Sequence, residues 1–114
     1  MRYMLLIGSD KAAPAGSKSE MEAIFQGHRR FTEELQAAGK MIHGERLRPD
    51  SDGSRVHLKA GQRQVVDGPF TETKEALGGF YLIDCETRAE AVDWAKKVPL
   101  RDGTYVEVRP IWAM

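Results

Sequence analysis

Two short segments of the chain, residues 2–8 and 79–84, are apolar at almost every position. Each has the length of a β-strand, and in the first segment apolar residues occupy both odd and even positions from Tyr3 to Ile7. Because successive side chains of a strand point to opposite faces, a sheet built from these segments needs cover on both sides. With 114 residues the chain can bury one hydrophobic core, so the choice of folds is narrow.

Two helices are predicted between and after these strands. The first precedes Gly39, a residue type that often ends helices, and the second precedes Pro99. Each opens with Ser or Thr three residues before Glu, the spacing of a capping box. The capping pairs are Ser19 with Glu22 and Thr87 with Glu90. One stripe of mainly apolar residues then recurs at helical intervals in each helix, at Met21, Ile24, Phe25, His28, Phe31 and Leu35 in the first and at Ala91, Val92, Trp94, Ala95 and Val98 in the second.

The remaining segments favour strands and a rigid loop. Residues 40–47 and 55–58 are predicted to form a hairpin through the polar turn at 49–53, with 64–66 as a third short strand. A last strand is expected at 105–111. Residues 67–75 are predicted to be a shaped loop that closes with a helical turn, because its Gly-Pro pair cannot continue a strand.

This order of elements predicts an α+β fold, a ferredoxin-like sandwich with an inserted hairpin, in a single domain spanning 1–114. Two helices can cover only one face of its antiparallel sheet. The second face then needs an apolar partner, which an identical subunit would supply. We therefore expect a homodimer, and a charge introduced at Leu5 or Tyr81 should disrupt its assembly.

Composition argues against some partners. Lys and Arg together number 17, as do Asp and Glu, so no net charge would attract nucleic acid or an anionic membrane. The single cysteine, Cys85, cannot form an intrachain disulfide, and the apolar run near the N-terminus is too short for a signal or a membrane span. We expect a cytoplasmic protein that binds neither nucleic acid nor membrane.

Asp67 and His28 are the candidate acid-base residues. Asp67 opens a rigid Gly-Pro turn, so its carboxylate is either a preorganised base or a cap of its own turn. His28 falls on the apolar face of the first helix, so its imidazole should point toward the sheet. There it is either a core residue or a proton-transfer group tuned by a neighbouring carboxylate.

Other polar residues give weaker signals. Arg109 and Glu107 share one side of the last strand, either as a surface pair or, if that side faces the loop at Asp67, with Arg109 as an anion-binding group. His43 and His57 have no spacing that suits a metal centre. We expect no metal and no cofactor; haem binding, a third possibility, requires an axial ligand that the sequence does not place.

The run from Asp67 to Glu75 (DGPFTETKE), followed by residues 77–81 and by 106–110 (VEVRP), resembles the YCII-related family in its DGPF branch. The resemblance covers nearly the whole chain and implies a dimeric α+β barrel. Some YCII-related enzymes remove halide from chlorinated aromatic substrates with a His and Asp pair, and the DGPF branch is linked with extracytoplasmic-function sigma factors. The resemblance places Asp67 at the head of the family motif with Phe70 as a ligand-binding residue, and it places His28 in the corresponding part of the first helix.

Two functions remain open from the sequence. The first is a small-molecule-binding homodimer in which His28 and Asp67 perform acid-base chemistry as a lyase or isomerase. The alternative is a non-catalytic regulatory or accessory module that senses a ligand or engages a protein in a sigma-factor system. The contact between His28 and Asp67 distinguishes the two.

Overall fold

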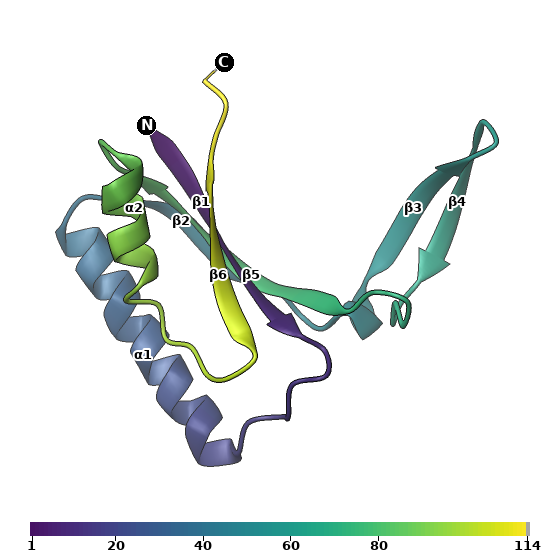
Figure 1. The fold of residues 1–114 in the computed structure, drawn as a ribbon, viewed down its shortest axis with the longest axis horizontal. Helices are drawn as coiled ribbons and strands as arrows, with labels where there is room; N and C mark the ends of the chain where they lie inside the picture. The colour runs from purple at the N-terminus through teal and green to yellow at the C-terminus, as the bar shows by residue number, and fades with distance from the viewer. Residues whose placement is uncertain (114) are drawn as a thin grey trace.

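The computed structural model describes residues 1–113 and shows two helices packed on a sheet, with a hairpin that projects away from them (Figure 1). In chain order the elements are β1 (Arg2–Asp10), α1 (Lys18–Ala37), β2 (Met41–Arg46), the 3-10 turn η1 (Asp50–Asp52), β3 (Ser54–Lys59), β4 (Gln62–Asp67), β5 (Glu75–Asp84), α2 (Arg88–Ala95) and β6 (Thr104–Pro110). The expected α+β class is confirmed, and the arrangement is compatible with a ferredoxin-like fold.

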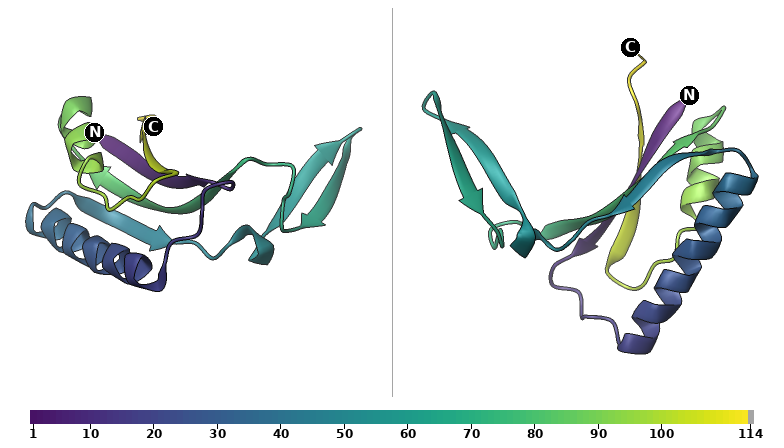
Figure 2. Two further views of the ribbon diagram at one scale, coloured as in Figure 1. Left: turned by 60° about the horizontal axis from the view of Figure 1, so that its bottom comes forward. Right: turned by 180° about the vertical axis from the view of Figure 1, so that it is seen from behind.

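Four strands form an antiparallel sheet in the order β2-β5-β1-β6. In its centre, Leu5 of β1 lies opposite both Tyr81 of β5 and Val108 of β6. The helices α1 and α2 lie on the same side of the sheet in all three views (Figures 1 and 2), and Phe31 of α1 contacts Trp94 of α2. Both helices contribute to the hydrophobic core with alternate residues of the strands, and that core contains Tyr3, Leu5, Phe31, Leu35, Tyr81, Ile83, Cys85, Ala91, Ala95 and Val98.

Alternation along β1 and β5 separates the two faces of the sheet. Leu5 and Tyr81 are only 0% and 8% exposed, because their side chains point into the core beneath the helices. They are therefore the wrong positions for testing a dimer, and the sequence prediction is corrected here. The side of the sheet away from the helices, here called the open face, carries Met4, Leu6, Phe80 and Leu82.

The hairpin pairs differently from the sequence prediction. β2 pairs with β5, not with β3, and the connection between β2 and β3 holds η1. β3 pairs with β4 through a turn at Ala60 and Gly61, whose φ angles are 51° and 77°. Positive φ at both central residues is typical of a type I′ hairpin turn. We call this isolated two-stranded unit, residues 54–67, the arm.

The helix caps are also partly different. α1 begins at Lys18, so the N-cap is Ser17, and its partner in the capping box is Glu20. The Ser19 and Glu22 pair has the same spacing but falls inside the helix. Thr87 does cap α2, although the Glu90 carboxylate accepts from the amide of Glu86 instead of completing the box. Neither helix within residues 1–113 has the length and apolar character needed to cross a membrane.

The loop after the arm is shorter than expected. β5 begins at Glu75, four positions before the predicted start, and the helical turn expected at residues 71–75 does not form. A single turn bond from the amide of Thr73 to the carbonyl of Phe70, at 3.2 Å, closes the loop instead. The pairing of β5 with β1 therefore begins at Glu75, which lies opposite Asp10. The sheet extends to the end of the loop.

Candidate functional site

A large open cavity lies between α1, the adjoining ends of β2 and β5, and the loops that lead to the arm. Its volume is about 1060 Å³. Ligand sites usually occupy roughly 300–1,000 Å³, so a small organic molecule fits with room to spare. α1 contributes Met21, Ile24, Phe25, His28 and Thr32, the sheet contributes Met41, Gly44, Arg46, Leu77, Phe80 and Tyr81, and the loops contribute Lys11, Asp50, Pro69, Thr71 and Arg101 among others.

His28 and Tyr81 form a polar pair on the wall of this cavity. The Nδ1 atom of His28 is 2.7 Å from the Tyr81 hydroxyl, and the two rings stack at 5.9 Å between centroids. The expected orientation of His28 toward the sheet is thus confirmed. Gly44 lies opposite Tyr81 in the sheet, and a Cβ atom there would be 2.7 Å from the tyrosine ring. A glycine at that position of β2 therefore leaves the space that Tyr81 occupies.

Both members of the pair are neutral near pH 7. Burial lowers the pKa of His28, and the positive charge of Arg46 lowers it further. Burial raises the pKa of Tyr81, against a smaller opposing effect of a hydrogen bond with Thr32. Tyr81 can donate to Nδ1 of His28, which leaves Nε2–H as a donor, or accept from Nδ1–H, which leaves Nε2 as a base. The pair can therefore give or take a proton.

A second cluster fixes the loop between the arm and β5. The ammonium group of Lys11 donates to Asp50 at 2.7 Å, to the carbonyl of Phe70 at 2.6 Å and to the hydroxyl of Thr73 at 2.8 Å. Asp50 also accepts from the amide of Phe70 at 3.3 Å. The hydrogen bond from Lys11, followed by that from Phe70, lowers the pKa of Asp50.

This cluster was not apparent in the sequence. Lys11 lies in a stretch of small residues that resembles a mobile loop, and Asp50 lies in a polar turn. The only sequence signal is a charged residue in each of two loops. The loops follow different strands, so the sequence separation of the two residues does not predict that they meet in space. The backbone of Asp50 also requires a glycine at position 68, because a Cβ atom there would be 1.8 Å from the carbonyl oxygen of Asp50.

Asp67 lies at the base of the arm, outside the cavity lining. Its carboxylate accepts a hydrogen bond of 2.7 Å from the hydroxyl of Ser54, the residue opposite it in the arm. Asp67 thus joins the two strands of the arm. His28 is bonded to Tyr81 instead, so within residues 1–113 the structure does not bring the two predicted acid-base residues together.

The two predicted ligand-binding residues also lie outside the cavity lining. Phe70 is 5% exposed, and the guanidinium group of Arg55 lies 4.0 Å from its ring centroid. Its buried ring anchors the loop. Arg109 forms an ion pair with Glu107 on β6. Arg109 lies opposite Met4 near the start of β1, whereas the loop that follows Asp67 enters β5 at Glu75, opposite Asp10 at the other end of β1, so Arg109 does not face that loop.

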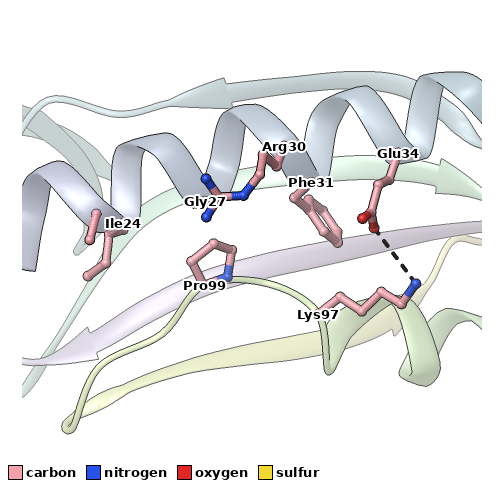
Figure 3. Close-up of a pocket in the computed structure, with 8 residues that line it drawn as sticks. Ile24, Gly27, Arg30, Phe31, Glu34, Lys97 and Pro99 are labelled. Carbon is pink, nitrogen blue, oxygen red and sulfur yellow. Dashed lines mark ion pairs between the residues drawn. The ribbon is translucent and has the colours of Figure 1, made fainter.

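A smaller groove of about 490 Å³ runs between α1 and the segment after α2 (Figure 3). Ile24, Gly27, Phe31 and Pro99 line it, and an ion pair of 3.7 Å between Glu34 and Lys97 lies at one end. Its charged lining residues are Arg30 and this ion pair, and its lining includes no histidine or tyrosine. The large cavity is therefore the better candidate site.

Metal and thiol chemistry find little support among the described residues. Within residues 1–113, no group of three or more His, Cys, Asp or Glu side chains is placed to hold a metal ion. Cys85 is buried at 1% exposure, and burial is the largest cause that raises its pKa. It therefore remains a thiol, which is a poor nucleophile.

Comparison with known proteins identifies a family. A family described as the YCII-related domain matches residues 1–114. An uncharacterized protein of Rhizobium meliloti (strain 1021), R00369, is 38% identical over 115 residues, which cover 97% of this chain and 92% of the relative. The family match spans every helix and strand described above.

Proposed function

The chain belongs to the family of YCII-related domains, and on that premise we propose that it is a homodimer that binds a small organic molecule in the large cavity. The observation that carries this proposal is the His28–Tyr81 pair, which places a neutral imidazole and a phenol on the wall of an otherwise largely apolar cavity. Cavities of this kind are the usual sites for small molecules. The DGPF run at residues 67–70 favours the DGPF branch of the family.

The chemistry that we propose is acid-base, as in a lyase or an isomerase. Such a reaction removes a proton from one atom of the substrate and returns it to another, or to a leaving group. His28 takes the proton through Nε2 when Tyr81 accepts from Nδ1–H. The same histidine can give the proton back once it is protonated, and its lowered pKa makes that release favourable.

Asp67 stays in the proposal as the second acid-base group, with one condition. Because its partner within the chain is Ser54, Asp67 can act with His28 only if a second copy carries it to the cavity. Phe70 supports a ligand indirectly, through the loop that includes Pro69 and Thr71 of the cavity lining. Arg109, exposed on the edge strand β6, would contribute an anion-binding group at a subunit interface.

The alternative is a non-catalytic regulatory or accessory module, in line with the sigma-factor association of the DGPF branch. One observation favours it, namely the apolar surface of the arm. Val56, Leu58 and Val65 lie on one face of the arm and are 63%, 69% and 68% exposed. Exposed apolar patches of this kind are typical of surfaces that contact another protein.

A ligand screen separates the two functions. Small aromatic acids and phenols are tested for thermal stabilisation of the wild type and of three variants, His28→Gln, Asp67→Asn and the control His57→Gln, which lies on the exposed arm. We expect the hits to lose their effect in His28→Gln and to keep it in the control. Each hit is then incubated with the protein in D₂O, and deuterium entering a carbon position of the ligand is measured by NMR.

The outcomes are distinct. Catalysed exchange that His28→Gln abolishes supports acid-base chemistry, and its loss in Asp67→Asn assigns the second group. Binding without exchange supports the regulatory alternative. Unchanged stabilisation in His28→Gln would remove the histidine from the site and contradict the proposal.

A further inference from the structure

We propose that the ligand of the large cavity is an apolar carboxylate, with the carboxylate held by Arg46 and the apolar body lying along the wall formed by α1 and β5. This inference rests on the proposed function, because it names the class of molecule that the same cavity binds. Arg46 is the last residue of β2 and lines the cavity, as does Phe25 on α1.

Arg46 differs from the other cations of the cavity lining. Lys11 forms its ion pair with Asp50 at 2.7 Å, and Arg48 forms one with Asp52 at 3.0 Å. Arg101 donates to the carbonyl of Pro14. Arg46 has no ion-pair partner among residues 1–113. Within residues 1–113, Arg46 and Arg101 are thus the two lining cations without a carboxylate partner, and of these only Arg101 is held by a side-chain hydrogen bond.

The position of Arg46 leaves its hydrogen-bond donors available. Its guanidinium carbon lies over the ring of Phe25, 4.2 Å from the centroid, in a cation–π contact. Such a contact does not use up the N–H groups along the edge of the guanidinium group, and within residues 1–113 Arg46 makes no side-chain hydrogen bond or ion pair. This edge is the geometry that binds a carboxylate through two parallel hydrogen bonds.

The acidic residues nearby do not occupy this edge. The Glu45 carboxylate is 3.6 Å from the imidazole of His43, the residue two positions earlier on the same strand. Asp50 accepts from Lys11 and from the amide of Phe70. The contact of Arg46 in the lining is the ring of Phe25, and the same stretch of α1 adds the apolar side chains of Met21 and Ile24 to the cavity wall. A carboxylate carried by an apolar molecule therefore complements both the charge and the walls.

The pairing of Arg46 with a carboxylate also orients the ligand. Arg46 lies over the ring of Phe25, which precedes His28 by one turn of α1. On β2 it lies two positions after Gly44, the residue opposite Tyr81, so it shares one stretch of the cavity wall with the His28–Tyr81 pair. A carboxylate on Arg46 thus directs the atoms next to it toward His28 and Tyr81. Arg46 is a binding residue in this arrangement, and His28 contacts the part of the ligand that reacts.

The test compares an acid with its neutral amide. 2-Naphthylacetate and 2-naphthylacetamide have nearly the same shape, and only the first carries a charge. Their affinities are measured by titration calorimetry with the wild type, Arg46→Gln and Arg29→Gln. The control residue Arg29 lies on α1 beside His28, is 76% exposed in its side chain and does not line the cavity.

We expect the wild type to bind the acid at least tenfold more tightly than the amide. Arg46→Gln should weaken the acid at least tenfold and leave the amide within twofold, and Arg29→Gln should change neither. Arg46→Lys keeps the charge and loses the planar donor edge, so its affinity for the acid should fall between those of the wild type and Arg46→Gln. This second variant also guards against a folding defect in the first.

Three results would overturn the inference. Equal affinity of the wild type for acid and amide, with NMR shifts at His28 and Tyr81 for both, would leave the cavity as a binding site and remove the carboxylate preference. Equal weakening of both ligands by Arg46→Gln would assign Arg46 to packing. Absence of binding by either molecule would contradict the inference and the proposed function together.

Discussion

At the scale of single residues, the titration of His28 is the most direct measure of its surroundings. Burial and Arg46 both lower its pKa, so the folded state disfavours the protonated imidazole that the unfolded chain accepts near pH 6.5. The unfolded state thus binds more protons between the two pKa values, and stability rises with pH there. The stabilisation is present above about pH 6.5 and is lost as the pH falls through the folded pKa.

We therefore predict that His28→Gln has a smaller pH dependence of the free energy of unfolding between pH 7 and pH 5 than the wild type. Urea unfolding at the two values measures the difference. NMR titration of the imidazole in Arg46→Gln provides the control, because removal of the positive charge should raise the pKa of His28. An imidazole that titrates at its ordinary pKa in the wild type would show that His28 is freely solvated.

The same residues show how far a sequence can locate a site. The helical spacing of apolar residues correctly points His28 at the sheet, because the periodicity of a helix fixes direction. The partner, Tyr81, lies in a run that is apolar at nearly every position, where the alternation of a strand cannot be used to assign faces. At Asp67 the sequence predicts a carboxylate held by a rigid turn. It does not reveal that this carboxylate accepts a hydrogen bond from Ser54.

At the scale of elements, the turn of the arm carries a strained residue. Ala60 has a φ of 51°, a region that costs residues with a Cβ about 1 kcal/mol or more and that Asn tolerates better. The Ala-Gly pair is also a weak hairpin signal, and the sequence prediction accordingly placed the turn at 49–53. The pairing of 55–58 with its true partner depends on this turn chemistry, which propensity alone does not reveal.

We predict that Ala60→Asn stabilises the arm by roughly 0.5–1 kcal/mol, because Asn-Gly is the preferred pair for a type I′ turn. Amide hydrogen exchange of Val56 and Val65, which are paired across the arm, reports local opening, and both amides should become more protected. Ala60→Val is the matched contrast, since a β-branched residue at positive φ should reduce protection. Equal exchange in the three proteins would mean that the turn conformation does not limit opening.

At the scale of the whole molecule, the arm and the open face determine the shape. The radius of gyration is 16.0 Å, whereas compact domains of about 100 residues have roughly 13 Å. The arm accounts for the difference, because it extends away from the sheet in every view (Figures 1 and 2). Isolated two-stranded hairpins are only marginally stable, and the open face remains without a helix. Both features suit a chain that completes its structure by association.

We predict a homodimer formed through the open face, with twice the monomer mass of 12.8 kDa in sedimentation velocity at micromolar concentration. Leu6→Lys and Leu82→Lys should each yield a folded monomer, because they place a charge at the centre of the open face. Ala37→Lys introduces the same charge on the exposed end of α1 and should leave the dimer intact.

The comparison with Leu5→Lys separates assembly from folding. Leu5 precedes Leu6 on β1 and is 0% exposed, so a lysine there should unfold the chain, and circular dichroism should show that loss. Leu6→Lys should retain the circular dichroism of the wild type and change only the sedimentation coefficient. The sequence predicts a second apolar face but not whether Leu5 or Leu6 lies on it. In a run that is apolar at every position, no polar residue marks which side chains face solvent. A wild-type protein that sediments as a monomer would show that the open face needs no partner, and both lysine variants would then affect stability alone.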